Sequence, residues 1–289
     1  MIVNENNQTK PPKITKTDLA QSLGVSRSSL YYQPLRPVKD LLIKSEIEKV
    51  LSDHPSYGHK RISMELKMNR KKVLRVMKKF DLKPYKRRIK RPSKPNDANK
   101  APTIYNNLIK TFCPIKPNIV WVADFTYIKF QNKFIYLSTV MDLFTREILG
   151  WGVSGNHDCF LVLESLNMAL PKTKKLPTYH HSDQGSEYDS YDYIKKLEEN
   201  NITISMSKKG HPWENGYQES FYSQFKVDLG RPDQFETWGE LIEAIHIQIN
   251  YYNSKRIHTS LKTSPIKFRE QYYLNLLTIN NLPRQRQLV

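Results

Sequence analysis

The sequence predicts an α/β protein: a mixed five-stranded sheet with helices, preceded by an all-helical, strongly basic region. Residues 1–110 contain 26 Lys and Arg against 9 Asp and Glu, whereas residues 111–289 contain 20 against 19. Near residue 118 the pattern changes to segments rich in β-branched and aromatic residues. Hydrophobic residues make up 38% of the chain, enough for a packed core. The formal net charge of +18 indicates a polyanionic partner.

Residues 15–32 have the pattern of a helix-turn-helix. Gly24 supplies the turn, and Ser26 is suited to cap a second helix that carries Arg27 and Ser28. The apolar face of the first helix consists of Leu19, Ala20 and Leu23. A plain helical hairpin is the alternative, but the surrounding positive charge favours DNA binding through Arg27 and Ser28.

Residues 40–53 and 59–81 are expected to form further helices. The apolar stripe of the last one consists of Val73, Leu74, Val76, Met77 and Phe80. Six cations surround that stripe: Arg70, Lys71, Lys72, Arg75, Lys78 and Lys79. No acid lies among them, so they repel one another unless an anion is bound. We therefore expect them to contact DNA phosphates rather than to form only a solvated face.

A basic segment at 83–102 is predicted to be an extended linker. It contains four prolines and eight cations, a composition that disfavours a helix. Lys86, Arg87 and Arg88 lie in this segment, and we expect them to follow a DNA backbone.

Five strands are expected beyond the linker, at about 119–130, 133–142, 146–154, 178–183 and 202–206. The first two are joined by a hairpin at Gln131 and Asn132. Helices are expected at about 158–170, 190–200, 213–227 and 236–252. Three strands, then helix, strand, helix, strand and helix is the element order of the ribonuclease H fold, which we therefore predict.

Three carboxylates are candidates for catalysis. Asp124 interrupts an otherwise hydrophobic strand, where an unpaired charge is costly. Asp183 ends the fourth strand, and Glu219 lies on the helix after the fifth. If the three converge, they would hold two Mg²⁺ ions, with Mn²⁺ as a substitute, because these cations prefer oxygen ligands. Two such ions support phosphodiester cleavage and strand transfer without a protein nucleophile.

The helix that carries Glu219 has two stripes. The stripe expected to pack on the sheet consists of Tyr217, Phe221 and Phe225. The other consists of Asn215, Glu219 and Lys226. Lys226 lies two helical turns after Glu219, so we expect it to contact DNA near the cleaved phosphate.

Spacing alone carries little weight, because 28 acids in 289 residues put an acid at roughly one position in ten. The surrounding residues carry more. The segments WVADFTYI (121–128), HSDQGSEY (181–188) and ENGYQESFYSQFK (214–226) resemble the three signature segments of DDE transposases of bacterial insertion sequences. The closest group is family three, second-frame (orfB) type, whose core is similar to retroviral integrases. Residues 251–268 and 57–62 are similar to that family's C-terminal box and helical N-terminal region.

The resemblance implies a transposase that cuts and joins DNA at the ends of an insertion sequence, with Asp124, Asp183 and Glu219 as its catalytic, metal-binding acids. It also implies double-stranded DNA partners, namely terminal repeats and target, and a homo-oligomer on DNA. The chain departs from the family at Glu214, where Asp is usual. This leaves open whether Glu214 assists the metal site.

The expected domains are a helix-turn-helix segment (1–38), a second helical DNA-binding segment (39–82), a basic Pro-rich linker (83–112), an integrase catalytic core (113–275) and a C-terminal tail (276–289). No membrane span or hydrophobic signal region is recognised, so we expect a cytoplasmic protein of bacteria, nucleoid-associated when bound to DNA. With only Cys113 and Cys159, neither a disulfide framework nor a Cys-based zinc site is expected.

Two other functions fit parts of the pattern: a non-catalytic DNA-binding protein and a ribonuclease H-class nuclease. The presence of all three acids argues against a non-catalytic DNA-binding protein. The basic N-terminal third argues against a plain nuclease, because it suits the binding of duplex transposon ends. His181 is a candidate phosphate contact, although a structural hydrogen bond is the commoner role. Trp121 and Trp213 are expected to be packing residues.

We predict that DNA affinity resides mainly in residues 1–110, because these residues carry a net charge of +17 out of +18. Binding measured by fluorescence anisotropy should weaken steeply with salt through counterion release. An isolated 111–289 fragment with the same affinity and salt dependence as the full chain would contradict this.

Overall fold

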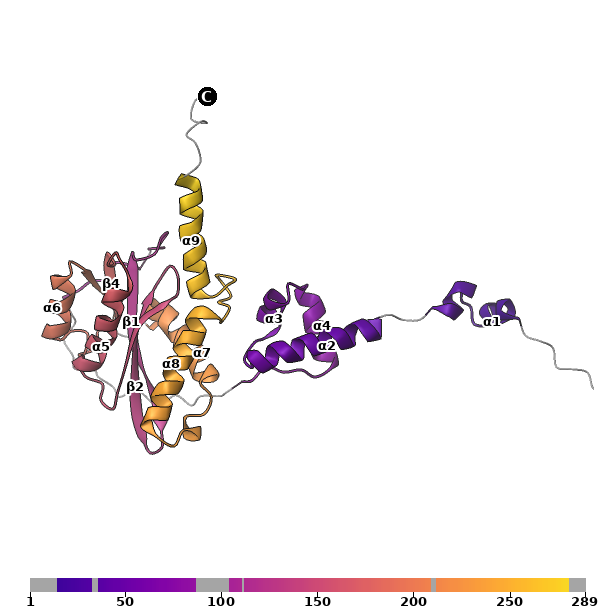
Figure 1. The fold of residues 1–289 in the computed structure, drawn as a ribbon, viewed down its shortest axis with the longest axis horizontal. Helices are drawn as coiled ribbons and strands as arrows, with labels where there is room; N and C mark the ends of the chain where they lie inside the picture. Colours follow the sequence, from indigo (N-terminus) through magenta and orange to yellow (C-terminus); the bar gives the residue numbers. More distant parts are fainter. Residues whose placement is uncertain (1–14, 33–35, 87–103, 111, 209–211, 281–289) are drawn as a thin grey trace, which may run out of the picture. The chain divides into compact units, whose positions relative to one another are not determined.

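The computed structural model describes residues 15–32, 36–86, 104–110, 112–208 and 212–280 (Figure 1). Packing divides the chain into two compact units, residues 1–46 and 47–289, which are described separately. The division falls inside a helix and not at the expected linker. None of the helices in the described ranges is long and apolar enough to cross a membrane.

The first unit contains α1 (Lys16–Ser22) and the 3-10 helix η1 (Arg27–Tyr31). Thr15 and Asp18 form a capping box at the start of α1, and Gly24 makes the turn with a φ of +63°. The second helix of the expected helix-turn-helix is only this five-residue 3-10 helix, and Ser26 does not cap its backbone. Of the predicted apolar face, Ala20 alone is buried, so this part of the prediction was wrong.

Three helices follow: α2 (Arg36–Asp53), α3 (His59–Glu65) and α4 (Arg70–Lys79). In α4 the predicted stripe is confirmed, since Val73 and Val76 are fully buried. The six predicted cations are all exposed: Arg70, Lys71, Lys72, Arg75, Lys78 and Lys79. Asn69 caps the start of α4, because its side chain accepts a hydrogen bond from the backbone N–H of Lys71.

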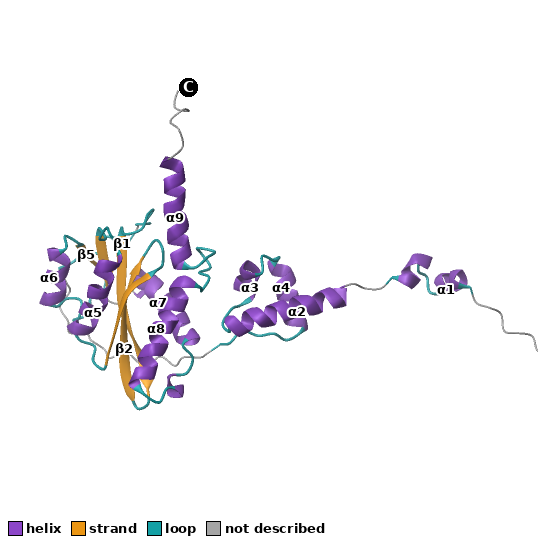
Figure 2. Cartoon of the chain, in the orientation of Figure 1, coloured by secondary structure: helices purple, strands orange, loops and turns teal. Residues whose placement is uncertain are grey.

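The sheet of the second unit, orange in Figure 2, has the strand order β3-β2-β1-β4-β5. Its strands are β1 (Val120–Phe130), β2 (Lys133–Asp142), β3 (Ile148–Ser154), β4 (Tyr179–Ser182) and β5 (Thr203–Met206). The first three are antiparallel and joined in sequence, whereas β4 is parallel to β1 and to β5. Gln131, with a φ of +50°, turns the predicted hairpin. The mixed sheet confirms the predicted ribonuclease H-like fold.

Helices cover both faces of the sheet, as Figure 1 shows. On one side α5 (Cys159–Ala169) and α6 (Tyr191–Glu199) pack in a core around Trp121. On the other side α7 (Gly216–Asp228) and α8 (Trp238–Ser254) pack in a core around Phe221. The 3-10 helices η2 (Leu170–Lys172), η3 (Pro212–Asn215) and η4 (Pro232–Gln234) complete the connections.

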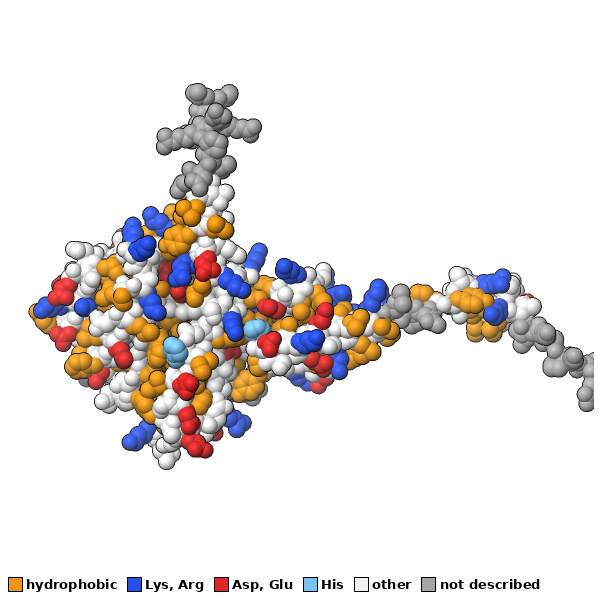
Figure 3. All heavy atoms as spheres, in the orientation of Figure 1, with side chains coloured by type: hydrophobic (Ala, Val, Ile, Leu, Met, Phe, Trp, Pro, Cys, Tyr) orange, Lys and Arg blue, Asp and Glu red, His pale blue; other side chains and the backbone are white. Residues whose placement is uncertain are grey.

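Two features were not predicted. Helix α9 (Pro265–Asn280) runs through the expected boundary between core and tail at 275/276. The second feature is the close approach of α5 to β3, where a Cβ on Gly150 or Gly152 would collide with backbone oxygens of the helix. On the face of this unit seen in Figure 3, acidic and basic side chains are interspersed, in keeping with the small net charge of residues 111–289.

The buried aromatic stripe of α7 gives a stability prediction. Phe225 is 3% exposed in the core, whereas Phe160 on α5 is 73% exposed. Phe225→Ala should lower the free energy of unfolding by about 3–5 kcal/mol, because it leaves a cavity. Equilibrium urea unfolding measures it, with Phe160→Ala as the matched control. Equal effects of the two substitutions would contradict the assignment of this face of α7 to the core.

Candidate active site

Asp124 and Asp183 lie on neighbouring parallel strands. The register pairs Val122 of β1 with His181 of β4, and each aspartate follows two residues later on its own strand or just beyond its end. Neighbouring strands are about 4.8 Å apart, so this register brings the two carboxylates side by side. Both side chains are half-buried. The structure thus brings together the first two predicted acids.

The negative charges of Asp124 and Asp183 both influence two buried tyrosine hydroxyl groups, those of Tyr188 and Tyr222. Burial, reinforced by Asp124 and Asp183, raises the pKa of Tyr188, and the same causes raise the pKa of Tyr222. The hydroxyl of Tyr188 is buried and makes no hydrogen bond within the described structure. The two tyrosines therefore stay neutral at physiological pH. Both are buried close enough to Asp124 and Asp183 to be influenced by their charges.

Helix α7 is attached to β1 through side chains that donate hydrogen bonds to backbone carbonyl oxygens. The Asn215 amide donates to Ala123 at 3.1 Å, and the Gln218 amide donates to Val122 at 2.7 Å. The Tyr222 hydroxyl donates to the carbonyl oxygen of Asp124 itself. Because these donors share one face of the helix, they fix its rotation about its own axis as well as its height along β1.

Glu219 lies between the anchoring residues, four positions after Asn215 and three before Tyr222. Its side chain is exposed on α7 at the level of Asp124. Among the residues that the structure describes, no three His, Cys, Asp or Glu side chains are grouped so as to hold a metal ion. The structure therefore gathers two of the predicted acids and carries the third on a helix fixed to the same strand. As a donor set, three carboxylates suit a hard divalent cation.

The loop after β4 contains a fourth acid, Glu187, that sequence reasoning did not single out. Glu187 is 7% exposed, and its Oε1 lies 2.8 Å from Nδ1 of His157. A Cβ on Gly185 would meet Oε2 of Glu187 at 2.7 Å and Oδ1 of Asp183 at 3.0 Å. The two carboxylates thus approach each other across Gly185. Glu187 stands within the quoted segment 181–188, but its partner His157 is 30 residues away in sequence, and no local pattern links them.

The two predicted stripes of α7 are confirmed in part. Phe221 and Phe225 are buried, but Tyr217 is 51% exposed, so its expected packing on the sheet was wrong. The ring of Tyr217 instead stacks against the guanidinium of Arg146. Lys226 is half-buried, and its Nζ lies 4.4 Å from the ring centroid of Tyr127 on β1. That cation–π contact holds the ammonium on the side of α7 that faces β1.

His181 has a structural role. It is fully buried on β4, with Nδ1 2.9 Å from Oγ of Ser205. Burial lowers the pKa of His181 to about 4, so the ring is neutral at physiological pH. Trp121 is also fully buried and donates to the side chain of Asn118, which confirms its packing role.

The remaining predicted residues lie outside the carboxylate pair. Glu214 accepts hydrogen bonds from Asn107 and from the backbone N–H of Lys208, which ties three segments together. Arg27, Ser28 and Lys86 are exposed. Arg87, Arg88 and the side chain of Trp213 lie outside the described residues.

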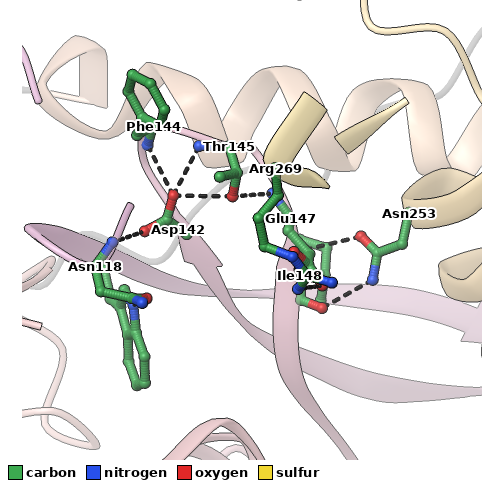
Figure 4. Close-up of polar contacts among 9 residues, drawn as sticks. Asn118, Asp142, Phe144, Thr145, Glu147, Ile148, Asn253 and Arg269 are labelled. Carbon is green, nitrogen blue, oxygen red and sulfur yellow. Dashed lines mark hydrogen bonds and ion pairs between the residues drawn. The ribbon is translucent and has the colours of Figure 1, made fainter. Parts of the chain in front are cut away.

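A second buried acid, Asp142, is structural (Figure 4). One of its carboxylate oxygens accepts from the backbone of Phe144 and Thr145 and from the Thr145 hydroxyl, and the other accepts from the backbone N–H of Asn118 at 2.7 Å. Burial raises its pKa, and these donors oppose that shift. Its carboxylate thus closes the turn between β2 and β3 and ties that turn to the segment before β1.

Comparisons with known proteins point to one family. Residues 114–212 and 200–265 each match an Integrase core domain family. The chain is 34% identical to the insertion element IS600 uncharacterized 31 kDa protein of Shigella sonnei, over 88% of this chain and 98% of the relative. It is 31% identical to the putative transposase InsK for insertion sequence element IS150 of Escherichia coli, over 94% of this chain and 98% of the relative.

Among solved structures, the HTLV-2 integrase catalytic core domain in complex with magnesium matches with a TM-score of 0.44 and 15% identity, over 54% of this chain and 98% of that chain. Taken with the relatives that align along almost their whole length, the two family matches confirm the resemblance found in the sequence. The chain belongs to the insertion-sequence transposases that contain an integrase core domain.

Proposed function

We propose that this transposase cleaves and joins DNA at the ends of its insertion sequence with Asp124, Asp183 and Glu219 as catalytic acids. The observation that carries the proposal is the parallel register of β1 and β4, which sets Asp124 beside Asp183. Its second support is the set of hydrogen bonds from α7 to residues 122–124, because it holds the helix of Glu219 against the same segment of β1.

The three carboxylates would hold two divalent cations, Mg²⁺ or Mn²⁺, through oxygen ligands. When bound, such ions activate a water or a 3′-hydroxyl and stabilise the leaving oxygen. The protein's own part is to hold the acids and the DNA in place. Tyr222 fixes the backbone at Asp124, Gly185 donates its N–H to Asp183 at 3.0 Å, and Lys226 would bind a backbone phosphate of the terminal strand.

The basic N-terminal third is proposed to bind the terminal repeats. Its support is the exposed cationic face of α4, together with the charge of the segment around Lys86. Two ends and a target must be held together for strand transfer, so we propose that the protein acts as a homo-oligomer on double-stranded DNA.

Replacing any one acid should abolish cleavage and joining but spare end binding. Asp124→Asn, Asp183→Asn and Glu219→Gln each remove a metal-binding charge while barely changing shape. Strand transfer with the element's own ends and Mg²⁺ measures the loss, and electrophoretic mobility shift measures binding. Asp192→Asn, an exposed acid on α6, is the matched control and should be fully active. Retained strand transfer in one of the three variants would remove that residue from the proposed triad.

Lys226→Ala should slow strand transfer and leave folding and metal binding nearly unchanged, because Lys226 contacts Tyr127 at the surface of β1 and not the core. Lys226→Arg should restore most of the rate, since it keeps the charge. Lys129→Ala removes an exposed cation from the same strand as Tyr127 and serves as the control. A wild-type rate for Lys226→Ala, or a melting temperature as low as that of Phe225→Ala, would count against a role in positioning DNA.

A further inference from the structure

The face of α7 that points away from Glu219 borders a cavity of about 650 Å³. Tyr217, Ser220 and Gln224 line it, and these residues lie on the side of the helix away from Asn215 and Glu219. The floor is apolar, formed by core residues such as Phe221 and Tyr252. The cavity therefore lies on the side of α7 opposite to Glu219.

The lining of this cavity is strongly basic. Its cations are Arg61, Lys110, Arg146 and Arg256, and Glu214 is the one acid among its lining residues. The carboxylate of Glu214 already accepts two hydrogen bonds. Arg256 is 3% exposed and is held by an ion pair with Asp228 and a hydrogen bond to Gln224. An excess of positive charge remains in a partly enclosed space, where an anion would be strongly favoured.

Two buried nitrogen atoms of the lining have no hydrogen-bond partner within the described structure: Nη1 of Arg146 and Nδ1 of His258. The Arg146 guanidinium lies 3.8 Å from the ring centroid of Tyr217, so its plane is held in place. His258 is kept neutral, because burial and then the charges of Arg146, Arg256 and Arg61 lower its pKa to about 4. A neutral imidazole can still donate one hydrogen bond. Buried polar atoms without partners are rare in folded proteins, and a bound ion or water is one of their ordinary explanations.

The backbone that carries Arg146 is held firmly. Its φ is +63°, and its N–H donates to the carbonyl oxygen of Asp142 at 2.8 Å. The Asp142 network of Figure 4 closes the same turn, and the Glu147–Arg269 ion pair next to it connects the turn to α9. A guanidinium fixed at both its backbone and its plane is suited to bind a planar or tetrahedral oxyanion.

We propose that this cavity is a phosphate-binding site for the DNA backbone, with Arg146, Lys110 and His258 as its contacts. This proposal rests on the proposed function, because the cavity would provide a second DNA contact on the side of α7 away from Glu219. The phosphate comes either from the transposon end or from target DNA, and the chemistry of recognition is the same for both.

The test measures DNA binding by the full chain without divalent metal, so that no cleavage occurs. One arm titrates a labelled duplex that carries the element's end. The other titrates an unrelated duplex onto protein already saturated with the end duplex. Arg146→Gln and Lys110→Gln should each lower affinity and reduce the slope of log affinity against log salt by about 0.9, the value for one phosphate contact with duplex DNA. His258→Gln should lower affinity with the slope unchanged, because the imidazole is neutral.

An effect in the first arm assigns the phosphate to the transposon end, and an effect only in the second assigns it to target DNA. Lys195→Gln, which removes an exposed cation from α6, is the control and should change neither slope nor affinity. Lys110 is exposed, so its variant answers the question even if Arg146→Gln lowers the melting temperature. Wild-type slopes in both arms for Lys110→Gln and a folded Arg146→Gln would overturn the proposal. Failure of the wild-type protein to transfer strands with Mg²⁺ would instead count against the proposed function and leave the binding result intact.

Discussion

The hydrogen bonds between α7 and the backbone of β1 are the interaction on which the rest of the site depends. Asn215, Gln218 and Tyr222 are buried, and together they donate to the carbonyl oxygens of three successive residues, 122–124. Tyr222 also contacts the hydroxyl of Thr139, so the anchor extends to β2. A buried polar group that loses its partner costs about 1–3 kcal/mol, so each bond opposes rotation of the helix. The acceptors are backbone atoms, and the helix is therefore positioned against the strand itself.

The same anchoring gives α7 two working faces. One carries Glu219 and Lys226 along β1, and the other borders the basic cavity beside Tyr217 and Gln224. Between them Phe221 and Phe225 fill the core. A single helix thus sets the distance between the carboxylate pair and the proposed phosphate site, and a rotation that improved one face would misplace the other.

Much of this architecture could be predicted because the relevant signals are local. The β-branched and aromatic composition of β1 and β2, the two-residue turn between them and the strand end at Asp183 can each be recognised within a short segment. The pairing of Asp124 with Asp183 then follows from the strand order. Helix α9 was missed because its apolar residues form no single stripe, and Leu274 and Leu277 are exposed. The 3-10 helix η1 was taken for an α-helix because capping residues mark where a helix starts but not how long it runs.

Other parts of the site could not be predicted because they depend on contacts between distant segments. Tyr217 has the spacing of a core residue, yet the guanidinium of Arg146, 71 positions earlier, offers its ring a partner at the surface. The pairing of Glu187 with His157 and the cavity around Arg146 arise in the same way. The close approach of α5 to Gly150 and Gly152 has a further consequence. At Gly150 the backbone of β3 lies directly against the backbone of α5, with no room for a side chain between them. A larger residue at that position would therefore push α5 away from the sheet and open the core on that side.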